Sequence, residues 1–291
     1  MIFVSTGGER HQKASETALQ YFDHGIHCVE LSGGAYSPTC EADLAALPGG
    51  MHLQVHNYFP PPELPFVFNL ASTDSEIARR SVAHVRNAIH VAVMLRRPIY
   101  SFHAGFRINP AVSELGARLG RHSLLARDVA LDVFGERVAA LAEEARREGV
   151  TLLVENNVIN KPNLETYGED PLLLTNPDEI ASFMERAPSN VGLLIDVAHL
   201  KVSANTRSFD MVVAHEKLKR WVKGYHLSDN AGAADTNDPV SEESWFWDHL
   251  VRGLDYYTLE VYRQPISKLV EQCALTEKVL ASANNSEVRY E

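Results

Sequence analysis

Short apolar runs alternate with helical patterns about eight times along this chain of 291 residues. Several runs, such as Leu152–Val154 and Gly192–Ile195, are continuously apolar or nearly so, which is typical of parallel strands covered on both faces. Eight strand–helix units predict an α/β fold of the (β/α)₈ barrel type rather than an open doubly wound sheet. The expected strands are Ile2–Thr6, Cys28–Leu31, His52–His56, Ile99–His103, Val150–Glu155, Val191–Asp196, Val222–His226 and Tyr256–Glu260.

The chain shows no internal boundary between domains. No linker rich in proline, serine or glycine, no block of charge and no shift in composition divides it, so residues 1–291 are expected to form a single domain. Apolar residues make up 45% of the sequence, which is enough for a sizeable core. No Gly-x-Gly-x-x-Gly run follows the first strand, which removes the main support for a dinucleotide-binding fold.

Local signals mark several helix ends. Thr73 and Glu76 have the spacing of a capping box and predict the start of a helix. Apolar residues at helical spacing from Val129 to Ala145 predict another helix, with Gly149 at its carboxyl-terminal cap.

The connecting segments differ in length at the two ends of the expected barrel. Segments that lead from a helix into a strand are short, whereas those after His103, Glu155 and His226 are long and rich in Gly, Asn, Asp and Pro. In barrels of this type the loops after the strands build the active site. We therefore expect the functional residues at the carboxyl ends of the strands.

Four of the expected strands end in hard metal ligands, namely Glu155, Asp196, His226 and Glu260. Three carboxylates close together raise one another's pKa values unless a cation lies between them. Oxygen and imidazole ligands suit Mn²⁺, Mg²⁺, Co²⁺, Fe²⁺ or Zn²⁺. Any one of these residues could be a salt-bridged strand end, but together they predict a metal enzyme.

Three histidines extend this hypothesis. His56 and His103 end two further strands and could hold a second metal together with Glu155, or could each donate to a backbone carbonyl. His199 follows Asp196 by one helical turn and could bind substrate or a second ion.

Other polar positions on the long loops are open to two interpretations. Lys201 could neutralise an acidic group of a substrate, and Asn157 could orient Glu155 or contact substrate, although asparagine is also frequent in turns. Trp245 and Trp247 could cover a sugar face or pack in the core.

The net charge limits the expected binding partners, and the cysteine content limits the expected cellular compartment. The formal net charge of −11 disfavours nucleic acid as a partner without excluding a local basic patch. The three cysteines, Cys28, Cys40 and Cys273, form no Cys-x-x-Cys pair and fit a reducing compartment. The apolar run near the amino terminus is too short for a signal peptide or membrane span, so a cytoplasmic protein without membrane association is expected. The sequence does not decide whether the protein forms a homo-oligomer.

The strand ends also carry a family resemblance. The chain resembles the xylose-isomerase-like TIM barrels, the superfamily that joins sugar isomerases and epimerases to AP endonucleases of the endonuclease IV type. The resemblance extends from the first strand to Glu260. Its motifs are His56-Asn-Tyr, Phe68-Asn-Leu-Ala-Ser, Phe102-His-Ala-Gly, Val154-Glu-Asn-Asn, Ile195-Asp-Val-Ala-His-Leu, Tyr225-His-Leu-Ser-Asp and Leu259-Glu-Val.

The epimerase branch implies an isomerase or epimerase of carbohydrate metabolism that acts on a small sugar or sugar phosphate. Glu155, Asp196, His226 and Glu260 would hold one divalent metal. Glu155 and Glu260, on opposite faces of the substrate, would relay a proton through a metal-stabilised enediolate, and His199 would contact a substrate oxygen.

The endonuclease branch is the alternative, and it implies three metals that attack a phosphodiester of abasic DNA. His56 and His103 would serve one metal with Glu155, and the four strand-end ligands would hold a second.

A third metal would need His199, an aspartate and a histidine from the loop after His226. Asp235 or Asp238 could supply the carboxylate, but no histidine occurs in that loop before His249. The same loop also departs from the pattern usual in epimerases. The single-metal set is complete, so the epimerase hypothesis leads. The third hypothesis, a metal-binding barrel without catalysis, ranks last, because the paired glutamates would then have no catalytic role.

Overall fold

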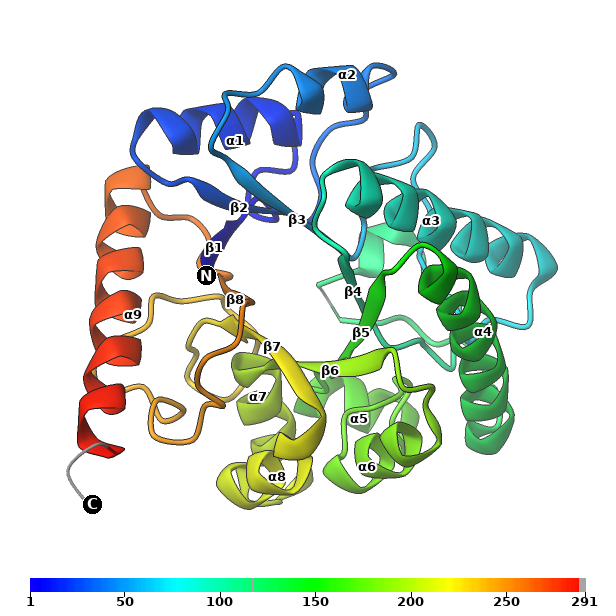
Figure 1. Cartoon of the computed structure of the whole chain (residues 1–291). Helices are drawn as coiled ribbons and strands as arrows, with labels where there is room; N and C mark the ends of the chain where they lie inside the picture. Colours follow the sequence, from blue (N-terminus) through cyan, green and yellow to red (C-terminus); the bar gives the residue numbers. More distant parts are fainter. Residues whose placement is uncertain (117, 288–291) are drawn as a thin grey trace.

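Eight strands pair in chain order and close on themselves, all of them parallel, in the computed structural model of the protein (Figure 1). The structure describes residues 1–116 and 118–287. The strand bounds differ from the predicted ones by at most one residue at either end, and the predicted (β/α)₈ barrel is confirmed. The strands are β1 Ile2–Ser5, β2 Cys28–Leu31, β3 His52–His56, β4 Ile99–His103, β5 Thr151–Glu155, β6 Val191–Asp196, β7 Val222–Leu227 and β8 Tyr257–Leu259.

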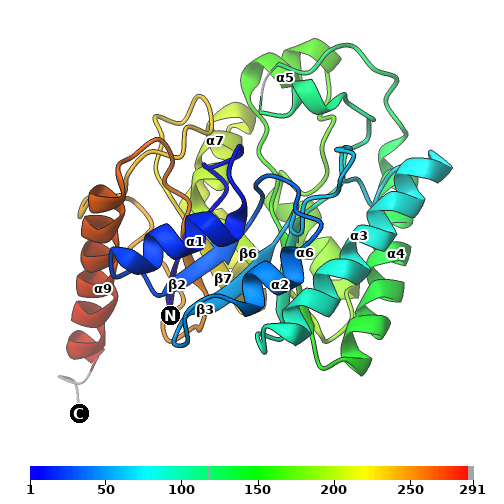
Figure 2. The ribbon, with the colours of Figure 1, turned by 90° about the horizontal axis from the view of Figure 1, so that it is seen from above.

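Helices surround the barrel, as Figure 1 shows. The α-helices are α1 Ala14–Asp23, α2 Cys40–Ala45, α3 Ser75–Met94, α4 Arg127–Arg147, α5 Lys161–Tyr167, α6 Pro177–Arg186, α7 Val197–Arg207, α8 Met211–Leu218 and α9 Ile266–Glu287. The segment from residue 228 to 256, between β7 and β8, contains no α-helix. Seen from the side, α5, α7 and the long loops lie at one end of the barrel, and the chain termini lie toward the other (Figure 2).

Helix ends agree with the sequence signals at one position and differ at another. Gly149 follows α4 with a φ of +72°, a left-handed conformation that confirms the predicted carboxyl-terminal cap. The prediction that Thr73 caps α3 is wrong by one residue. Asp74 is the cap, because its carboxylate accepts the backbone N–H groups of Glu76 and Ile77 at 2.9 and 3.0 Å.

The apolar stripe of α4 is displaced at its first turn. Val129 is exposed, and Ala130 and Phe134 face the core instead. Val138 and Ala145 are buried as expected. Val129 therefore lies just outside the face that packs on the barrel. The spacing of apolar residues in the sequence does not distinguish Val129 from its buried neighbour Ala130.

The inside of the barrel changes from apolar to polar along the strands. Phe3, Leu153, Leu194 and Tyr256 form a buried cluster within it. Successive side chains of a strand alternate between its two faces, so the residues two positions beyond Leu153 and Leu194 also point inward. These residues are Glu155 and Asp196. The apolar cluster thus closes the barrel beneath a polar layer at the carboxyl ends of the strands.

A buried histidine outside that layer predicts how stability depends on pH. His84 of α3 lies 2.9 Å from the Asn57 carbonyl, and burial lowers the pKa of its imidazole to about 4. The unfolded imidazole, with a pKa of about 6.5, gains its proton at higher pH than the folded one. The free energy of unfolding should therefore fall as the pH drops from about 6.5 to about 4, with His84 contributing on the order of 3 kcal/mol.

Urea unfolding at several pH values tests this expectation. His84→Gln should flatten the pH dependence, whereas His90→Gln, on an exposed position of the same helix, should leave it as in the unmodified protein. An unchanged slope in His84→Gln would show that the neutral imidazole does not contribute.

Candidate metal centre

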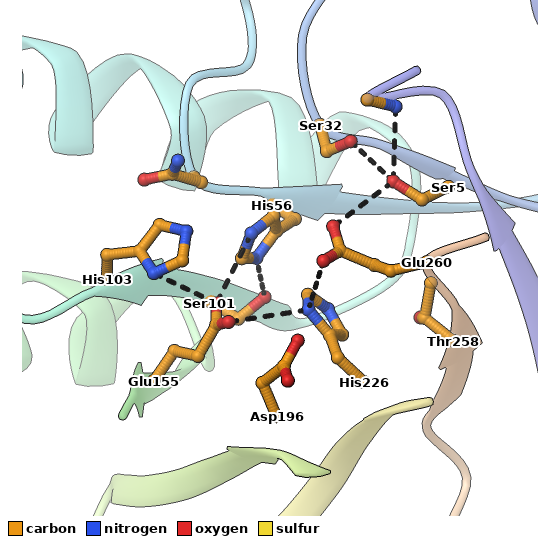
Figure 3. Close-up of polar contacts among 12 residues, drawn as sticks. Ser5, Ser32, His56, Ser101, His103, Glu155, Asp196, His226, Thr258 and Glu260 are labelled. Atoms are coloured by element: carbon orange, nitrogen blue, oxygen red, sulfur yellow. Dashed lines mark hydrogen bonds and ion pairs between the residues drawn. The ribbon is translucent and has the colours of Figure 1, made fainter. Parts of the chain in front are cut away.

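The four predicted strand-end ligands meet at the polar end of the barrel interior. Glu155, Asp196 and His226 end or nearly end β5, β6 and β7, and Glu260 follows β8. Their side chains point toward one another (Figure 3). Nδ1 of His226 lies 3.6 Å from Oε1 of Glu155 and 3.5 Å from Oε2 of Glu260. Ligand atoms of Glu155, Asp196 and His226 all lie within 4.8 Å of one another. The structure thus brings these residues together, and their metal-binding role remains a prediction.

Several atoms at this point lack partners within the described part of the chain. Both carboxylate oxygens of Glu155, Oδ2 of Asp196 and Nδ1 of His226 are buried and form no hydrogen bond. A buried charged or polar atom without a partner costs free energy, and such atoms are rare in folded proteins. A divalent cation would satisfy all of them at once, and the oxygen and imidazole donors suit the hard and borderline metals. The residues present therefore fit a metal ion.

A second group shares Glu155. Nε2 of His56 and Nδ1 of His103 lie 3.4 and 3.5 Å from Oε2 of Glu155. Ligand atoms of these three residues also lie within 4.8 Å of one another. Because Oε1 of Glu155 faces His226, the two oxygens of one carboxylate face two different groups. The structure thus brings His56, His103 and Glu155 together, and a second cation bridged by Glu155 stays a prediction.

His199 joins the site from the first turn of α7. Its backbone N–H donates to Oδ1 of Asp196 at 2.7 Å, so Asp196 both caps the helix and faces the site. The ring contacts the Asn156 carbonyl through Nδ1 at 2.9 Å and Oδ2 of Asp235 through Nε2 at 3.2 Å. Of the two aspartates considered from the sequence, Asp235 is the one that reaches His199. Asp238 instead accepts a hydrogen bond from Thr236.

Two residues that the sequence suggested for substrate binding are occupied by other contacts. The Lys201 ammonium donates to Oδ1 of Asp229 at 2.6 Å and to the Asn230 carbonyl. The Asn157 amide donates to the carbonyls of Ala104, Gly105 and Leu173. Both side chains therefore brace the protein's own loops, and neither enters the substrate site proposed below.

The aromatic residues before β8 pack rather than cover the site. Trp247 is 4% exposed, and its indole N–H donates to the Ser241 carbonyl. Trp245 packs edge-on against His215 and Phe246. The alternative that these rings serve the core is the one their contacts support.

Sequence reasoning missed Glu30. This residue lies in the middle of β2, is fully buried, and places Oε2 3.0 Å from Nε2 of His226. A charged residue inside the short run Cys-Val-Glu-Leu was the available signal, because only an inward position with polar partners tolerates it. Tyr262 was also missed, and its hydroxyl donates to Oε1 of Glu260 at 2.9 Å.

The electrostatics of the centre show a shortage of positive charge. Burial raises the pKa of Asp196 to about 7. Burial opposes a charge on His226, but the carboxylates of Glu30, Glu260 and Glu155 outweigh it and raise the pKa of that imidazole.

Two other groups titrate well outside the neutral range. Burial opposes the charge of Glu155, but His103 and His226 outweigh it and lower the pKa of the carboxyl. Burial lowers the pKa of His56 to about 3, so this ring is neutral at neutral pH and can donate a lone pair to a metal. The protein alone compensates its carboxylates by protonating histidines, and a divalent cation would replace those protons.

Residues 23–262 match the sequence model of the family described as xylose isomerase-like TIM barrel. The chain belongs to this family. The match contains every residue of both candidate metal groups, from His56 to Glu260, and also Glu30. No curated protein is significantly similar in sequence.

Solved structures share the family's fold at low sequence identity. A D-tagatose 3-epimerase-like protein is 18% identical, with a TM-score of 0.74 and coverage of 98% of each chain. An L-ribulose 3-epimerase is 17% identical, with a TM-score of 0.67 and coverage of 100% of this chain and 99% of that one. A xylose isomerase-like TIM barrel protein from Mycobacterium smegmatis in complex with magnesium is 15% identical, with a TM-score of 0.68 and 97% of each chain covered.

No helix within residues 1–116 and 118–287 is both long enough and apolar enough to cross a bilayer.

Proposed function

We propose that the protein is a divalent-metal-dependent isomerase or epimerase of a small sugar or sugar phosphate. The observation that carries this proposal is the convergence of two buried glutamates on one imidazole. Glu155 and Glu260 come from separate strands and face the same nitrogen of His226 at 3.6 and 3.5 Å. The family membership and the fold shared with solved structures described as 3-epimerases support it.

Glu155, Asp196, His226 and Glu260 would hold the cation, which could be Mn²⁺, Co²⁺, Mg²⁺, Fe²⁺ or Zn²⁺. When bound, such a cation polarises two adjacent oxygens of a hydroxy-ketone or hydroxy-aldehyde and acidifies the C–H bond between them. The ligands are nearly inaccessible to solvent, with exposures of 0 to 7%, so their interactions with a bound substrate are little weakened by water.

The two glutamates would move the proton. One carboxylate removes it from the substrate carbon as general base, and the other returns a proton to the opposite face. Glu260 is held for this role, because Tyr262 and Ser5 donate to its Oε1 at 2.9 and 3.5 Å while Oε2 faces His226. His199, fixed by Asp235, would contact a substrate oxygen.

His56, His103 and Glu155 would hold a second cation. This group also favours the alternative function, an endonuclease IV-like phosphodiesterase acting on abasic DNA. The approach of Asp235 to His199 favours it too, since both would belong to a third metal. Against it, none of the metal-capable clusters within the described residues includes His199, and the net charge is −11.

The proposal is tested by incubating the metal-loaded protein in D₂O with ketopentoses, ketohexoses and their phosphates. Proton NMR should show deuterium entering at the carbon next to the carbonyl, together with the epimeric or isomeric sugar. Nicking of an abasic DNA duplex without such exchange would replace the proposal by the phosphodiesterase. Metal binding with neither reaction would favour the barrel without catalysis.

A further inference from the structure

A buried chain of hydrogen bonds runs beneath the two cation positions and joins His56 to His226. Nδ1 of His56 lies 2.9 Å from the Ser101 hydroxyl, which lies 2.7 Å from the Tyr256 hydroxyl. Tyr256 in turn donates to Oε2 of Glu30 at 2.5 Å, and Nε2 of His226 lies 3.0 Å from the same oxygen. All five side chains are at most 2% exposed, so they are shielded from bulk water.

Each hydroxyl group in this chain of hydrogen bonds can donate in only one direction. Oε2 of Glu30 accepts from three groups, which are Tyr256, Thr258 and His226. The single hydroxyl proton of Tyr256 is therefore used on Glu30, and Ser101 must donate to Tyr256.

The same counting fixes the next link. Ser101 also has one hydroxyl proton, so its contact with His56 requires the imidazole to be the donor. His56 then carries its proton on Nδ1, and Nε2 is left with a lone pair.

We propose that Glu30, Tyr256 and Ser101 are positioning residues that set the tautomers of both metal-facing histidines from one buried carboxylate. The neutral ring of His56 carries its proton on Nδ1, and the ring of His226, when a cation is bound, carries its proton on Nε2. The free nitrogens, Nε2 of His56 and Nδ1 of His226, then face the two cation positions. The metal-binding part of this inference rests on the proposed function.

The contacts of the free nitrogens agree with this assignment. Nε2 of His56 faces Oε2 of Glu155 at 3.4 Å, yet that oxygen accepts no hydrogen bond within the described residues. Nδ1 of His226 faces Oε1 of Glu155 at 3.6 Å and is likewise without a partner there. A lone pair opposite a carboxylate oxygen is repulsive unless a cation lies between them. Partners behind metal-binding histidines commonly orient the ring in this way.

Nitrogen NMR of the metal-free protein tests the tautomer directly. With ¹⁵N-labelled histidine, the long-range proton–nitrogen spectrum should show His56 protonated at Nδ1. Tyr256→Phe breaks the chain and frees the Ser101 proton, so His56 should shift toward the Nε2-protonated form. Thr258→Val removes a bond to the same Glu30 oxygen without breaking the chain, and it should leave the His56 signals unchanged.

Metal titration supplies an independent measurement. Tyr256→Phe should weaken binding of Co²⁺ or Zn²⁺ at the His56 position by about ten- to a hundredfold, the range seen when a partner of a metal ligand is removed. The His226 position, whose bond to Glu30 remains, should change less, and Thr258→Val should match the unmodified protein at both. Ser101→Ala tests the same link if Tyr256→Phe does not fold.

The results that overturn the inference differ from those that overturn the proposed function. Protonation of His56 at Nε2 in the unmodified protein would overturn the inference, as would an unchanged tautomer in both Tyr256→Phe and Ser101→Ala. A protein that binds none of Mn²⁺, Co²⁺, Mg²⁺, Fe²⁺ and Zn²⁺ would overturn the proposed function. The tautomer would still be read from the metal-free spectrum.

Discussion

Replacing Glu155 by glutamine is expected to reduce deuterium exchange into the sugar to background. The loss of proton transfer alone should cost about 10²- to 10⁴-fold in rate. Glu155 also faces both candidate cation positions, with one oxygen toward His226 and the other toward His56 and His103. Elemental analysis of the purified variant should therefore show both cations lost or strongly depleted.

Two other substitutions make this result specific. Glu165→Gln changes an exposed glutamate of α5, on the same strand-end segment, and should leave exchange and metal content intact. Glu260→Gln should also abolish turnover, but the His56, His103 and Glu155 group does not include Glu260 and should keep its ion. A Glu155→Gln protein that still exchanges substrate hydrogen would contradict its role as base.

Removing the metals with a chelator is expected to abolish activity and to lower stability. An ion that binds only the folded state stabilises it by about 2.7 kcal/mol when present at about 100 times its Kd. Its removal should therefore lower the midpoint of thermal unfolding by roughly 4–6 °C in a domain of this size. The reason is local, because Glu155 and Asp196 have buried oxygens that accept no hydrogen bond within the described residues, and without the cation only protonated histidines compensate their charge.

Differential scanning calorimetry with and without chelator measures this change, and adding back Mn²⁺, Co²⁺ or Zn²⁺ identifies the metals that restore it. The Glu155→Gln protein is the control, since a variant that has lost its ions should unfold at the same temperature in both conditions. Identical unfolding curves for the unmodified protein, with chelator and without, would argue against a resident cation.

The sequence alone determined the barrel and the main set of candidate metal ligands. Strand positions follow from short apolar runs, and the ends of parallel strands in a closed barrel lie at one rim, so residues such as Glu155 and Asp196 could be grouped without coordinates. Local chemistry also placed the Gly149 cap correctly, although Asp74 replaced Thr73 as the cap of α3.

The tertiary structure decided the partners of those ligands. The sequence suggested Lys201 and Asn157 as substrate contacts. In the folded protein both side chains instead donate hydrogen bonds to the protein's own loops. Asp235 reaches His199 through the long segment before β8, which carries no periodic pattern to reveal its path. Glu30 is far from His226 in the chain and adjacent to it only because the barrel closes. The sequence pattern of a strand depends on residues that are neighbours in the chain. Hydrogen bonds across the barrel depend on how distant segments pack, so the local sequence pattern does not predict them.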